Sequence, residues 1–301
     1  MSQEKNIDIS IIIVSYNTKE FLQKCLNSIK SSTGRLTREV FVIDNASQDS
    51  SAKLVKEKYE WVHLIESSKN LGFAKAANQA VKKAKGRYIL LLNPDTILEK
   101  NTLWETLKFM DKNPEAGVST CRVELESGEI DWASHRGFPT PWRSFSYFSR
   151  LSKLFPNSKL FGGYHLEYED LRRIHEIDSP SGAFYLVRQE AVKKVGLLDE
   201  DYFMYAEDLD WSYRIKEAGF KIFYYPKVKV THSKGAASGM HSIKSKATSK
   251  DRRQATESFY ETMKIFYKKH YENKHPRLVK LLIFWGIDYL KGRRLSKLGL
   301  A

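Results

Sequence analysis

The residues best placed to do chemistry lie in a short run, 87–96, where an apolar segment ends in a turn that carries one carboxylate, Asp95. Residues 88–92 are too few for a helix and lie between turn-prone residues, so they predict a strand buried on both faces. Pro94 cannot donate to a sheet and biases Asn93 toward an extended backbone, so the strand should end there. Open α/β sheets bind ligands at the carboxyl ends of such strands. Taken alone, Asp95 is equally well explained as a loop residue capping a helix that begins near Asn101.

Two further groups of polar residues follow expected strands. Ser15, Tyr16 and Asn17 come after the first strand, and Asp44 and Asn45 come after the second. The carboxyl ends of parallel strands meet at one edge of a sheet, so we expect both groups to converge on the turn at 93–95. The aspartate is a candidate acceptor for a base or a ribose hydroxyl, and the tyrosine could pack on a nucleobase. Turn or cap chemistry explains each loop by itself.

The elements that position these loops alternate along the chain. Segments 7–14, 39–43, 61–65 and 88–92 predict strands, and segments 18–31, 49–59 and 72–84 predict helices. Thr18 is an expected N-cap, and Gly72 allows a close backbone approach. This alternation is typical of an α/β sheet flanked by helices, and residues 1–120 are expected to form one continuous layer.

Residues 124–177 follow no such pattern and are expected to be an irregular excursion that faces an acceptor. They are rich in aromatic and basic side chains, such as Trp132 and Trp142. Aromatic faces suit sugar rings, and Arg136 and Arg143 could meet an acceptor phosphate. Packing at the surface explains both arginines equally well.

Composition limits the class of protein. The 301 residues are 42% hydrophobic, enough to bury a substantial core. Cys25 and Cys121 lack CxxC spacing and lie in apolar stretches, so we expect core thiols in a reducing compartment, without a disulfide framework or structural zinc. The first eight residues lack the pattern of a secretory signal, and no run of 18 apolar residues predicts a membrane-spanning helix.

The net charge of +14 is concentrated near the end of the chain, where residues 241–301 hold 15 Lys and Arg against 5 Asp and Glu, a net charge of +10. Segments 259–271 and 276–290 mix apolar, aromatic and basic residues and predict amphipathic helices. Such helices can lie on an anionic membrane surface. The alternative is a pair of ordinary helices packed on the main domain with a solvated basic face.

Taken together, the motifs resemble family 2 glycosyltransferases, particularly the rhamnosyltransferase-like branch. The resemblance covers about residues 7–240 and rests on Val14-Ser-Tyr-Asn17, Asp44-Asn-Ala-Ser47, Asn70-Leu-Gly-Phe73, Asn93-Pro-Asp-Thr96, Ser181-Gly-Ala-Phe184, the run 199–210 and Val230-Thr-His232. It implies a GT-A fold, a Rossmann-like mixed sheet flanked by helices, to which the chain adds C-terminal amphipathic helices. The implied organisation is a GT-A domain at 1–240, with a nucleotide-binding half at 1–120 and an acceptor-binding and catalytic half at 121–240, followed by a basic helical tail at 241–301.

The resemblance also assigns roles to residues. Asp95, the last position of an Asp-X-Asp-like element whose first acid is replaced by Asn93, would bind a divalent metal, Mg²⁺ or Mn²⁺, and His232 would lie near the metal or the diphosphate. Asp208 matches the catalytic base, and Glu207 would orient it or bind the acceptor. The acids of this segment could instead simply favour the dipole of the helix that they begin. The donor nucleotide would meet a set of loop residues: Ser15, Tyr16, Asn17, Asp44, Asn45, Asn70, Gly72, Phe73, Asn78 and Asn93.

The implied activity is inverting transfer of one sugar, possibly rhamnose, from a dTDP- or UDP-linked donor to a glycan or polyprenyl-linked acceptor in cell-surface polysaccharide synthesis. The Gln-X-X-Arg-Trp motif of processive members is absent from the sequence, which favours a single addition. The basic tail favours a cytoplasmic protein that is peripheral at the inner face of the cell membrane. The alternative is a non-catalytic sugar-binding or nucleic-acid-binding protein. Nucleic-acid binding would not require Asp95 and Asp208, so no nucleic acid is expected as a partner.

Overall fold

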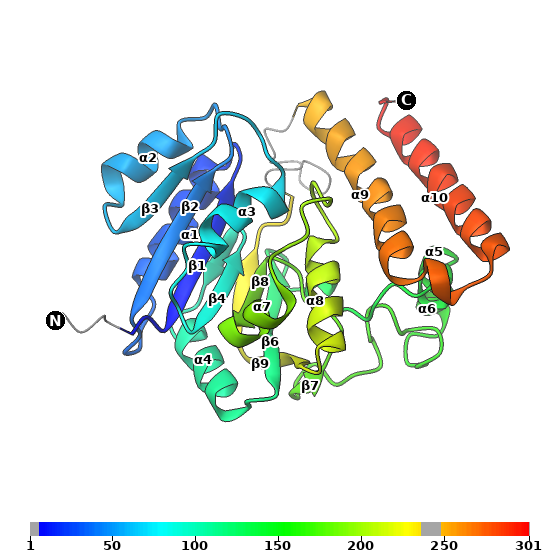
Figure 1. The fold of residues 1–301 in the computed structure, drawn as a ribbon, viewed down its shortest axis with the longest axis horizontal. Coiled ribbons are helices and arrows are strands. Elements are labelled where there is room, and N and C mark those ends of the chain that lie inside the picture. Colours follow the sequence, from blue (N-terminus) through cyan, green and yellow to red (C-terminus); the bar gives the residue numbers. More distant parts are fainter. Residues whose placement is uncertain (1–5, 236–247, 301) are drawn as a thin grey trace.

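A nine-stranded mixed sheet forms the centre of the computed structural model, which describes residues 6–235 and 248–300. The strands are β1 (Ile9–Ser15), β2 (Arg38–Asp44), β3 (Val62–Glu66), β4 (Tyr88–Leu92), β5 (Thr96–Leu98), β6 (Ala116–Leu125), β7 (His175–Glu176), β8 (Phe184–Arg188) and β9 (Lys221–His232). Their order is β3-β2-β1-β4-β8-β6-β9-β5, and β7 pairs with β9. The first four strands are mutually parallel, whereas β8 runs antiparallel between β4 and β6 (Figure 1). The predicted mixed α/β sheet is therefore confirmed.

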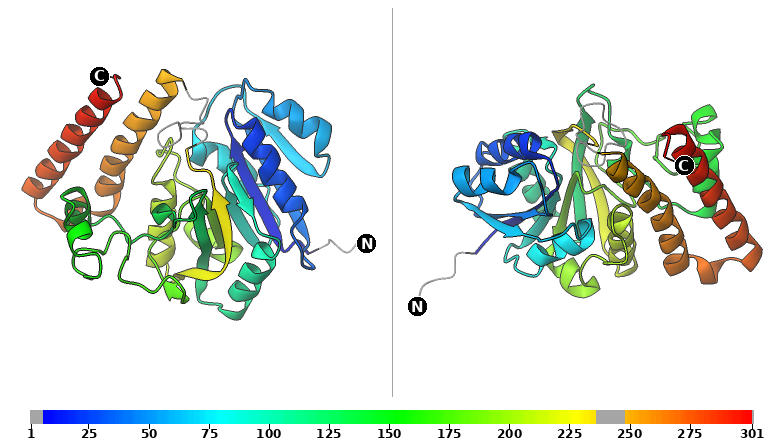
Figure 2. Two further views of the ribbon diagram at one scale, coloured as in Figure 1. Left: turned by 180° about the vertical axis from the view of Figure 1, so that it is seen from behind. Right: turned by 90° about the horizontal axis from the view of Figure 1, so that it is seen from above.

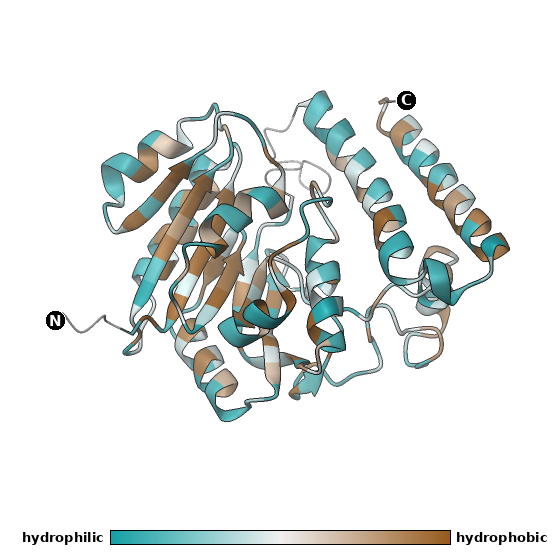
Figure 3. Ribbon diagram, viewed as in Figure 1, coloured by the Kyte–Doolittle hydropathy of each residue, from teal (hydrophilic) through white to brown (hydrophobic). Residues whose placement is uncertain are grey.

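Helices cover both faces of this sheet. The helices are α1 (Lys19–Lys30), α2 (Ser51–Lys58), α3 (Phe73–Val81), α4 (Thr102–Lys112), α5 (Pro141–Phe148), α6 (Leu151–Leu154), α7 (Gln189–Val195), α8 (Glu207–Glu217), α9 (Ser249–His270) and α10 (Arg277–Lys297), with short 3-10 turns η1 (Trp132–Ser134) and η2 (Glu272–Lys274). The apolar sides of α1, α2 and α4 pack on one face, and those of α3, α7 and α8 pack on the other. All seven residues of β1 are buried, as expected for a strand covered on both sides. Hydrophobic residues predominate along the central strands in Figure 3, whereas the helices mix hydrophobic and hydrophilic residues.

The predicted elements of the first half are confirmed with small shifts at their ends. The helix expected at 72–84 is shorter, because α3 ends at Val81. Thr18 occupies the N-cap position of α1, but its side chain does not cap the helix. Its hydroxyl lies 2.9 Å from that of Ser15 instead, so it tightens the loop after β1. Cys25 and Cys121 are both buried free thiols.

The expectation of an irregular stretch at 124–177 is wrong in part. The segment contains η1, α5, α6 and the short strand β7. Thr140 caps α5 by accepting a hydrogen bond from the backbone N–H of Arg143, and Pro141 occupies the first turn of the helix. A Thr-Pro pair at these positions is a helix-start signal, which the aromatic and basic composition of the segment obscured.

The described part of the C-terminal tail packs on the main domain through α9. Phe266, Tyr267 and Tyr271 join a buried cluster with Tyr202 and Leu209 beside α8. His270 Nε2 lies 2.8 Å from Asp210 Oδ1 on α8. The next helix, α10, runs beside α9 at the end of the molecule farthest from β3 (Figures 1 and 2). In residues 6–235 and 248–300, no helix is long and apolar enough to cross a membrane.

Candidate active site

The carboxyl ends of β1 and β2 bring the first two polar loops together, as the sequence predicts. Ser15 and Asp44 are paired in the parallel register, and the backbone N–H of Asn45 donates to the carbonyl of Ser15 over 2.8 Å. Asp44 Oδ2 accepts a hydrogen bond from the backbone N–H of Ser47 over 3.0 Å. Asp44 Oδ1 is buried and has no partner within the described residues. A buried carboxylate oxygen without a donor is costly, so this atom is prepared to accept a hydrogen bond from a ligand.

The loop before α3 joins the same edge. The amide of Asn45 donates to Asn70 Oδ1 over 2.8 Å and to the carbonyl of Gly72 over 3.2 Å. Gly72 has φ of +78°, and a Cβ at this position would lie 2.3 Å from the carbonyl oxygen of Phe203. Only glycine therefore fits where this loop meets the segment that leads into α8. Phe73 begins α3, and its N–H donates to that same carbonyl over 2.7 Å.

Tyr16 and Asn17 of the predicted donor set are also engaged by the protein itself. The Tyr16 hydroxyl donates to Asp251 Oδ1 on α9 over 3.4 Å, which links the donor loop to the tail. Asn17 adopts a left-handed backbone with φ of 54°, and its Oδ1 accepts the N–H of Gln48 over 2.8 Å. Both side chains order the loop after β1.

Asn78 has a structural role in this fold. Its amide donates to the carbonyl of Leu198 over 2.9 Å and to Glu200 Oε1 over 3.0 Å, and its Oδ1 accepts the N–H of Leu198. Its side chain therefore ties α3 to the segment after α7, and its amide is occupied by these contacts.

Asp95 and His232 meet because their strands pair. In the antiparallel pair of β5 and β9, Thr96 lies opposite His232. The side chains are both buried, and His232 Nε2 lies 3.2 Å from Asp95 Oδ1. The Asn93 amide is 3.4 Å from the same imidazole nitrogen. The two residues that the sequence assigns to the metal are thus in direct contact.

Asp131 completes this group and was missed by the sequence analysis. It is the N-cap of η1, and its Oδ2 accepts a hydrogen bond from His232 Nδ1 over 2.8 Å, while its Oδ1 lies 2.6 Å from Lys234 Nζ. Burial acts to lower the pKa of His232, but the two carboxylates outweigh it and raise that pKa to about 9. Burial also acts against ionisation of Asp131, yet His232 and Lys234 hold the pKa of its carboxyl well below the usual range. Nothing in the sequence marks an aspartate 101 residues from His232 as its partner.

The residues present fit a divalent metal that would be bound partly by the protein and partly by the oxygens of a diphosphate. Asp95 offers a carboxylate oxygen, and His232 would offer Nε2 after losing the proton that its raised pKa retains, with the ring oriented through Nδ1 by Asp131. Among the residues that the structure describes, no group of three or more His, Cys, Asp or Glu side chains is arranged to hold a metal. Mg²⁺ and Mn²⁺ at phosphate sites are bound by few protein groups and by phosphate oxygens, which matches this sparse donor set.

Asp208 lies at the start of α8 and is held by an arginine from the excursion. Its Oδ2 pairs with Arg136 Nη2 over 2.8 Å, and both side chains are about nine-tenths buried. The same Nη2 donates to the carbonyl of Pro180 over 3.0 Å. Arg143 likewise pairs with a carboxylate, because its Nη1 lies 2.7 Å from Asp178 Oδ2. Both arginines are thus paired within the protein, so the expectation that they face an acceptor phosphate is not supported.

Glu207 is a buried acid beside Asp208. Its Oε2 has no hydrogen-bond partner among the described residues. Burial, and then the negative charge of Asp208, raise the pKa of Glu207 well above its usual range. The preceding Ala206 has φ of +63°, which is strained for a residue with a Cβ. A strained turn and a protonated acid are more than helix capping requires, which favours a functional role over simple interaction with the helix dipole.

The segment 180–183 lies between the two groups of acids. The Pro180 carbonyl accepts the hydrogen bond from Arg136 that holds Asp208. A Cβ at Gly182 would lie 3.6 Å from Asn93 Oδ1 and 3.5 Å from the ring of Phe73. The Asp208 side and the Asn93–Asp95 side of the site therefore border the same short segment.

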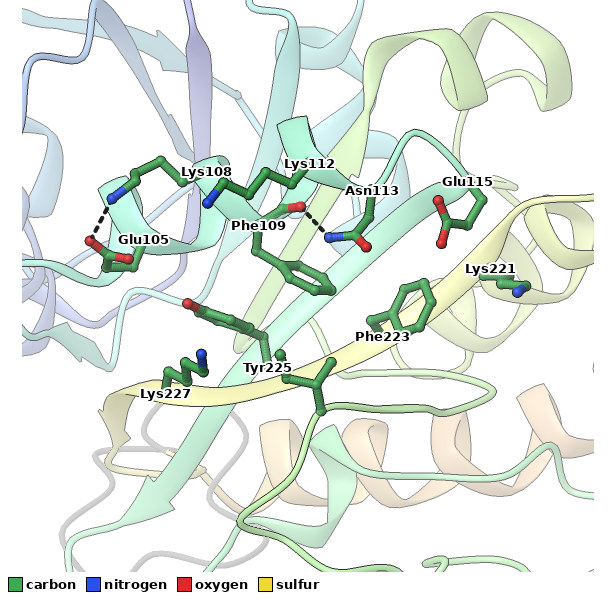
Figure 4. A pocket seen from close by; sticks show the side chains of 11 residues that line it. Glu105, Lys108, Phe109, Lys112, Asn113, Glu115, Lys221, Phe223, Tyr225 and Lys227 are labelled. Carbon is green, nitrogen blue, oxygen red and sulfur yellow. Dashed lines mark hydrogen bonds and ion pairs between the residues drawn. The ribbon is translucent and has the colours of Figure 1, made fainter.

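A cleft elsewhere does not belong to this site. It lies between α4 and the first half of β9, with Phe109, Phe223 and Tyr225 among its lining residues and several lysines around them (Figure 4). None of the predicted site residues lines it, and His232 is at the opposite end of β9.

Comparison with known proteins gives the class. The model of the family "Glycosyl transferase family 2" matches residues 10–194, more than half of the chain. The N-acetylglucosaminyl-diphospho-decaprenol L-rhamnosyltransferase of Mycobacterium tuberculosis is 26% identical over 246 residues, covering 77% of this chain and 78% of that protein. Rhamnosyltransferase WbbL of Escherichia coli K12 is 28% identical over 233 residues, covering 74% of this chain and 83% of that protein.

Solved structures agree on the fold. A mannosyltransferase from Pyrobaculum calidifontis in complex with GDP-Man and Mn²⁺ matches with a TM-score of 0.57 at 18% identity, over 86% of this chain and 65% of that one. Residues 1–349 of Staphylococcus aureus TarS match with a TM-score of 0.54 at 16% identity, over 84% of this chain and 65% of that one.

The fold is the GT-A fold, and the family match identifies the protein as a glycosyltransferase. The chain belongs to glycosyltransferase family 2, and within it this protein is rhamnosyltransferase-like.

Proposed function

We propose that the protein transfers one sugar, rhamnose, from a dTDP- or UDP-linked donor to a polyprenyl-linked glycan acceptor in cell-surface polysaccharide synthesis. The observation that carries the proposal is that segment 180–183 borders both Asp208 and the Asn93–Asp95 turn. Direct displacement with inversion needs a base and a leaving group on opposite sides of one sugar, and this segment separates the candidates for those two roles.

Asp208 is the proposed base, which takes the proton of the attacking acceptor hydroxyl. Its ion pair with Arg136 fixes the orientation of the carboxylate in a buried setting. Glu207 keeps its proton beside it, so the pair carries one negative charge instead of two. The segment from Tyr205 to Ala206, with two successive positive φ angles, aims both acids from the start of α8.

The proposed donor site lies across that segment, at the ends of β1, β2 and β4. The free oxygen of Asp44 accepts a hydrogen bond from the base or ribose, and Asn45 and Asn70 fix the loop around it. Asp95 and His232 would hold the divalent metal that neutralises the leaving diphosphate. Asp131, which also pairs with Lys234, keeps His232 in place.

The names of two relatives support rhamnose as the sugar, and one of them supports a lipid-linked acceptor. We further propose that the tail contacts an anionic membrane surface, where such an acceptor would be found. Five large apolar side chains on α10 are more than half exposed: Leu278, Leu281, Leu282, Trp285 and Tyr289. They lie opposite Ile283, Phe284 and Ile287, by which α10 packs. A contact at the cytoplasmic face would follow from the positive charge.

Calorimetric titration of dTDP and UDP, with and without Mn²⁺, tests the donor site in the wild type and in Asp95→Ala. We expect metal-dependent binding of one nucleotide and its loss in a folded Asp95→Ala protein. Asp170→Ala is the matched control, because Asp170 pairs only with surface arginines. Binding of neither nucleotide would contradict the proposal. Binding without hydrolysis or transfer of the sugar nucleotide would instead favour the non-catalytic sugar-binding alternative.

A further inference from the structure

We propose that residues 141–161, which form α5, α6 and the turn after them, insert into the same anionic bilayer as α10 and give the enzyme a second membrane contact beside its acceptor site. The inference rests on the membrane contact of the proposed function and extends it to a segment that neither the family match nor the basic tail explains. We call residues 141–161 the aromatic patch.

The exposure of apolar side chains is concentrated in two places. Within the described residues, the exposed large apolar side chains of the aromatic patch are Trp142, Phe145, Tyr147, Phe148, Leu154, Phe155 and Leu160, and those of α10 are the five named above. Outside these two segments the described chain exposes only Trp61, Ile97 and Ile174 in this class. Leu154 is 70% exposed and Phe145 is 56% exposed, so more than half of each residue is in contact with solvent. Such a concentration marks an interaction surface.

The aromatic patch is held in a defined shape. The indole of Trp142 donates to the carbonyl of Leu160 over 2.8 Å, which closes the segment on itself. The ring of Phe161 lies 5.9 Å from that of Trp142 and 5.3 Å from that of Phe155. These contacts hold the exposed rings in a defined arrangement. A loop without them would lose more conformational entropy when it binds.

Charge identifies the occupant of this surface. Residues 141–161 contain Arg143, Arg150, Lys153 and Lys159 and no Asp or Glu. Three of these cations are exposed, whereas Arg143 is turned inward to Asp178. Exposed aromatic and aliphatic side chains interleaved with cations, and with no acid to repel phosphate, are typical of a segment that lies in the headgroup region of an anionic membrane. A second copy of this chain would bring the same positive charge to the interface, which makes a dimer contact unfavourable.

The two contacts lie at the same end of the molecule. Figures 1 and 2 show α5 and α6 at the end that carries α10, away from β2 and β3. Attachment at two places restricts rotation about either one, so it fixes which side of the enzyme faces the lipid.

The aromatic patch is also connected to the proposed base. Arg136, which pairs with Asp208, is five residues before the start of α5. The backbone N–H of Gly137 donates to the carbonyl of Tyr164 over 2.8 Å, and Phe138 N–H donates to Asp178 Oδ2 over 3.0 Å. The residues just before and just after the patch are therefore held together next to Arg136. Insertion of the patch would therefore bring the Asp208 side of the site to the membrane, where a polyprenyl-linked acceptor presents its sugar.

The test uses the full-length protein with a single fluorescent label. Cys25 and Cys121 are buried, so a Phe145→Cys variant can be labelled selectively with an environment-sensitive dye. Trp61→Cys is the matched control, because Trp61 is also an exposed aromatic residue but lies beside β3 at the other end of the sheet. Vesicles of phosphatidylcholine alone and of phosphatidylcholine with phosphatidylglycerol are then added. We expect a blue shift for the label at 145 with anionic vesicles and none for the label at 61.

A second measurement separates the patch from the tail. Co-flotation with the anionic vesicles is compared for the wild type, Phe145→Ser/Phe148→Ser and Leu281→Ser/Trp285→Ser. Each pair is expected to weaken partitioning about tenfold, because each removes two apolar side chains from the interface. Unchanged partitioning of the Phe145→Ser/Phe148→Ser protein would overturn the inference, even if the α10 variant has lost binding. A blue shift that depends on protein concentration and not on vesicles would overturn it in favour of a dimer.

Donor binding distinguishes these outcomes from failure of the proposed function. All variants are titrated with dTDP and UDP in the presence of Mn²⁺, without vesicles. If the proposed donor site is correct, nucleotide binding is the same in all of them, whatever their membrane affinity. If the wild type binds neither nucleotide, the result counts against the transferase site and leaves the vesicle result unaffected.

Discussion

Asp131 and His232 share a buried hydrogen bond in which Nδ1 of the imidazole donates to the carboxylate over 2.8 Å. The bond leaves Nε2 directed at Asp95, 3.2 Å away. Metal-binding histidines are commonly oriented in this way by a carboxylate on the far ring nitrogen. Asp131 bonds to Nδ1 and Asp95 lies by Nε2, the other ring nitrogen, so the role of Asp131 is to position His232.

Asp131→Asn should weaken Mn²⁺-dependent nucleotide binding about 10- to 100-fold, because the amide cannot hold His232 and Lys234 as the carboxylate does. Calorimetric titration measures the change in affinity. A second readout is the imidazole pKa, followed by NMR, which should fall from about 9 toward its ordinary value. Asp170→Asn serves as the control, at a partly exposed aspartate that pairs with surface arginines. An unchanged nucleotide affinity and imidazole pKa would show that Asp131 does not position His232.

Asp208→Asn should lower the rate of sugar transfer about 10²- to 10⁴-fold, the range expected for loss of a general base. Nucleotide affinity should not change, because the proposed function places Asp208 on the acceptor side of segment 180–183. Transfer from a labelled sugar nucleotide gives the rate, and calorimetry gives the affinity. Glu217→Gln, at the exposed end of the same helix, is the control. Retention of the wild-type rate by Asp208→Asn would rule it out as the base.

The sequence predicted those parts of the site that are local in the chain. Each loop at 15–17, 44–45 and 93–95 follows its own strand, so strand patterns and turn residues were sufficient to place it. The contact of Asp95 with His232 depends on a long-range strand pair, β5 with β9. The strand patterns did not predict this pair, and only the family resemblance placed both residues near the metal.

The partners of the site residues could not be predicted. Asp131 and Arg136 come from a stretch without clear periodicity, and they meet His232 and Asp208 through tertiary packing. The tail shows the same limit. Its amphipathic pattern predicted two helices but could not tell them apart. In the structure α9 packs on α8, whereas α10 exposes an apolar stripe. Which apolar face finds a partner is decided by the surface of the main domain.

Glu207→Gln should change how stability depends on pH. In the wild type the folded-state pKa of Glu207 is raised, so the folded protein holds a proton that the unfolded chain releases. The stabilisation from this proton is fully present below the ordinary glutamate pKa and is lost as pH rises through the folded-state value. Glutamine stays neutral at every pH, so the variant should gain stability relative to the wild type as pH rises from about 5 to 9. Urea unfolding at several pH values measures this difference. A constant difference across that range would mean that Glu207 is ionised in the folded protein.

The two tail helices should contribute unequally to stability. A chain that ends at Gly235 loses α9, which exposes Tyr202 and Leu209 and removes the His270–Asp210 pair beside the proposed base. Burial of a large aromatic side chain such as Phe266 contributes about 3–5 kcal/mol, so this chain should lose cooperative unfolding or most of its stability. A chain that ends at His275 keeps α9 and loses only α10, whose outward face is already exposed, so its melting temperature should fall by only a few degrees. Calorimetric melting of both chains beside the full-length protein makes the comparison. Equal melting temperatures for the two shortened chains would mean that α9 does not support α8.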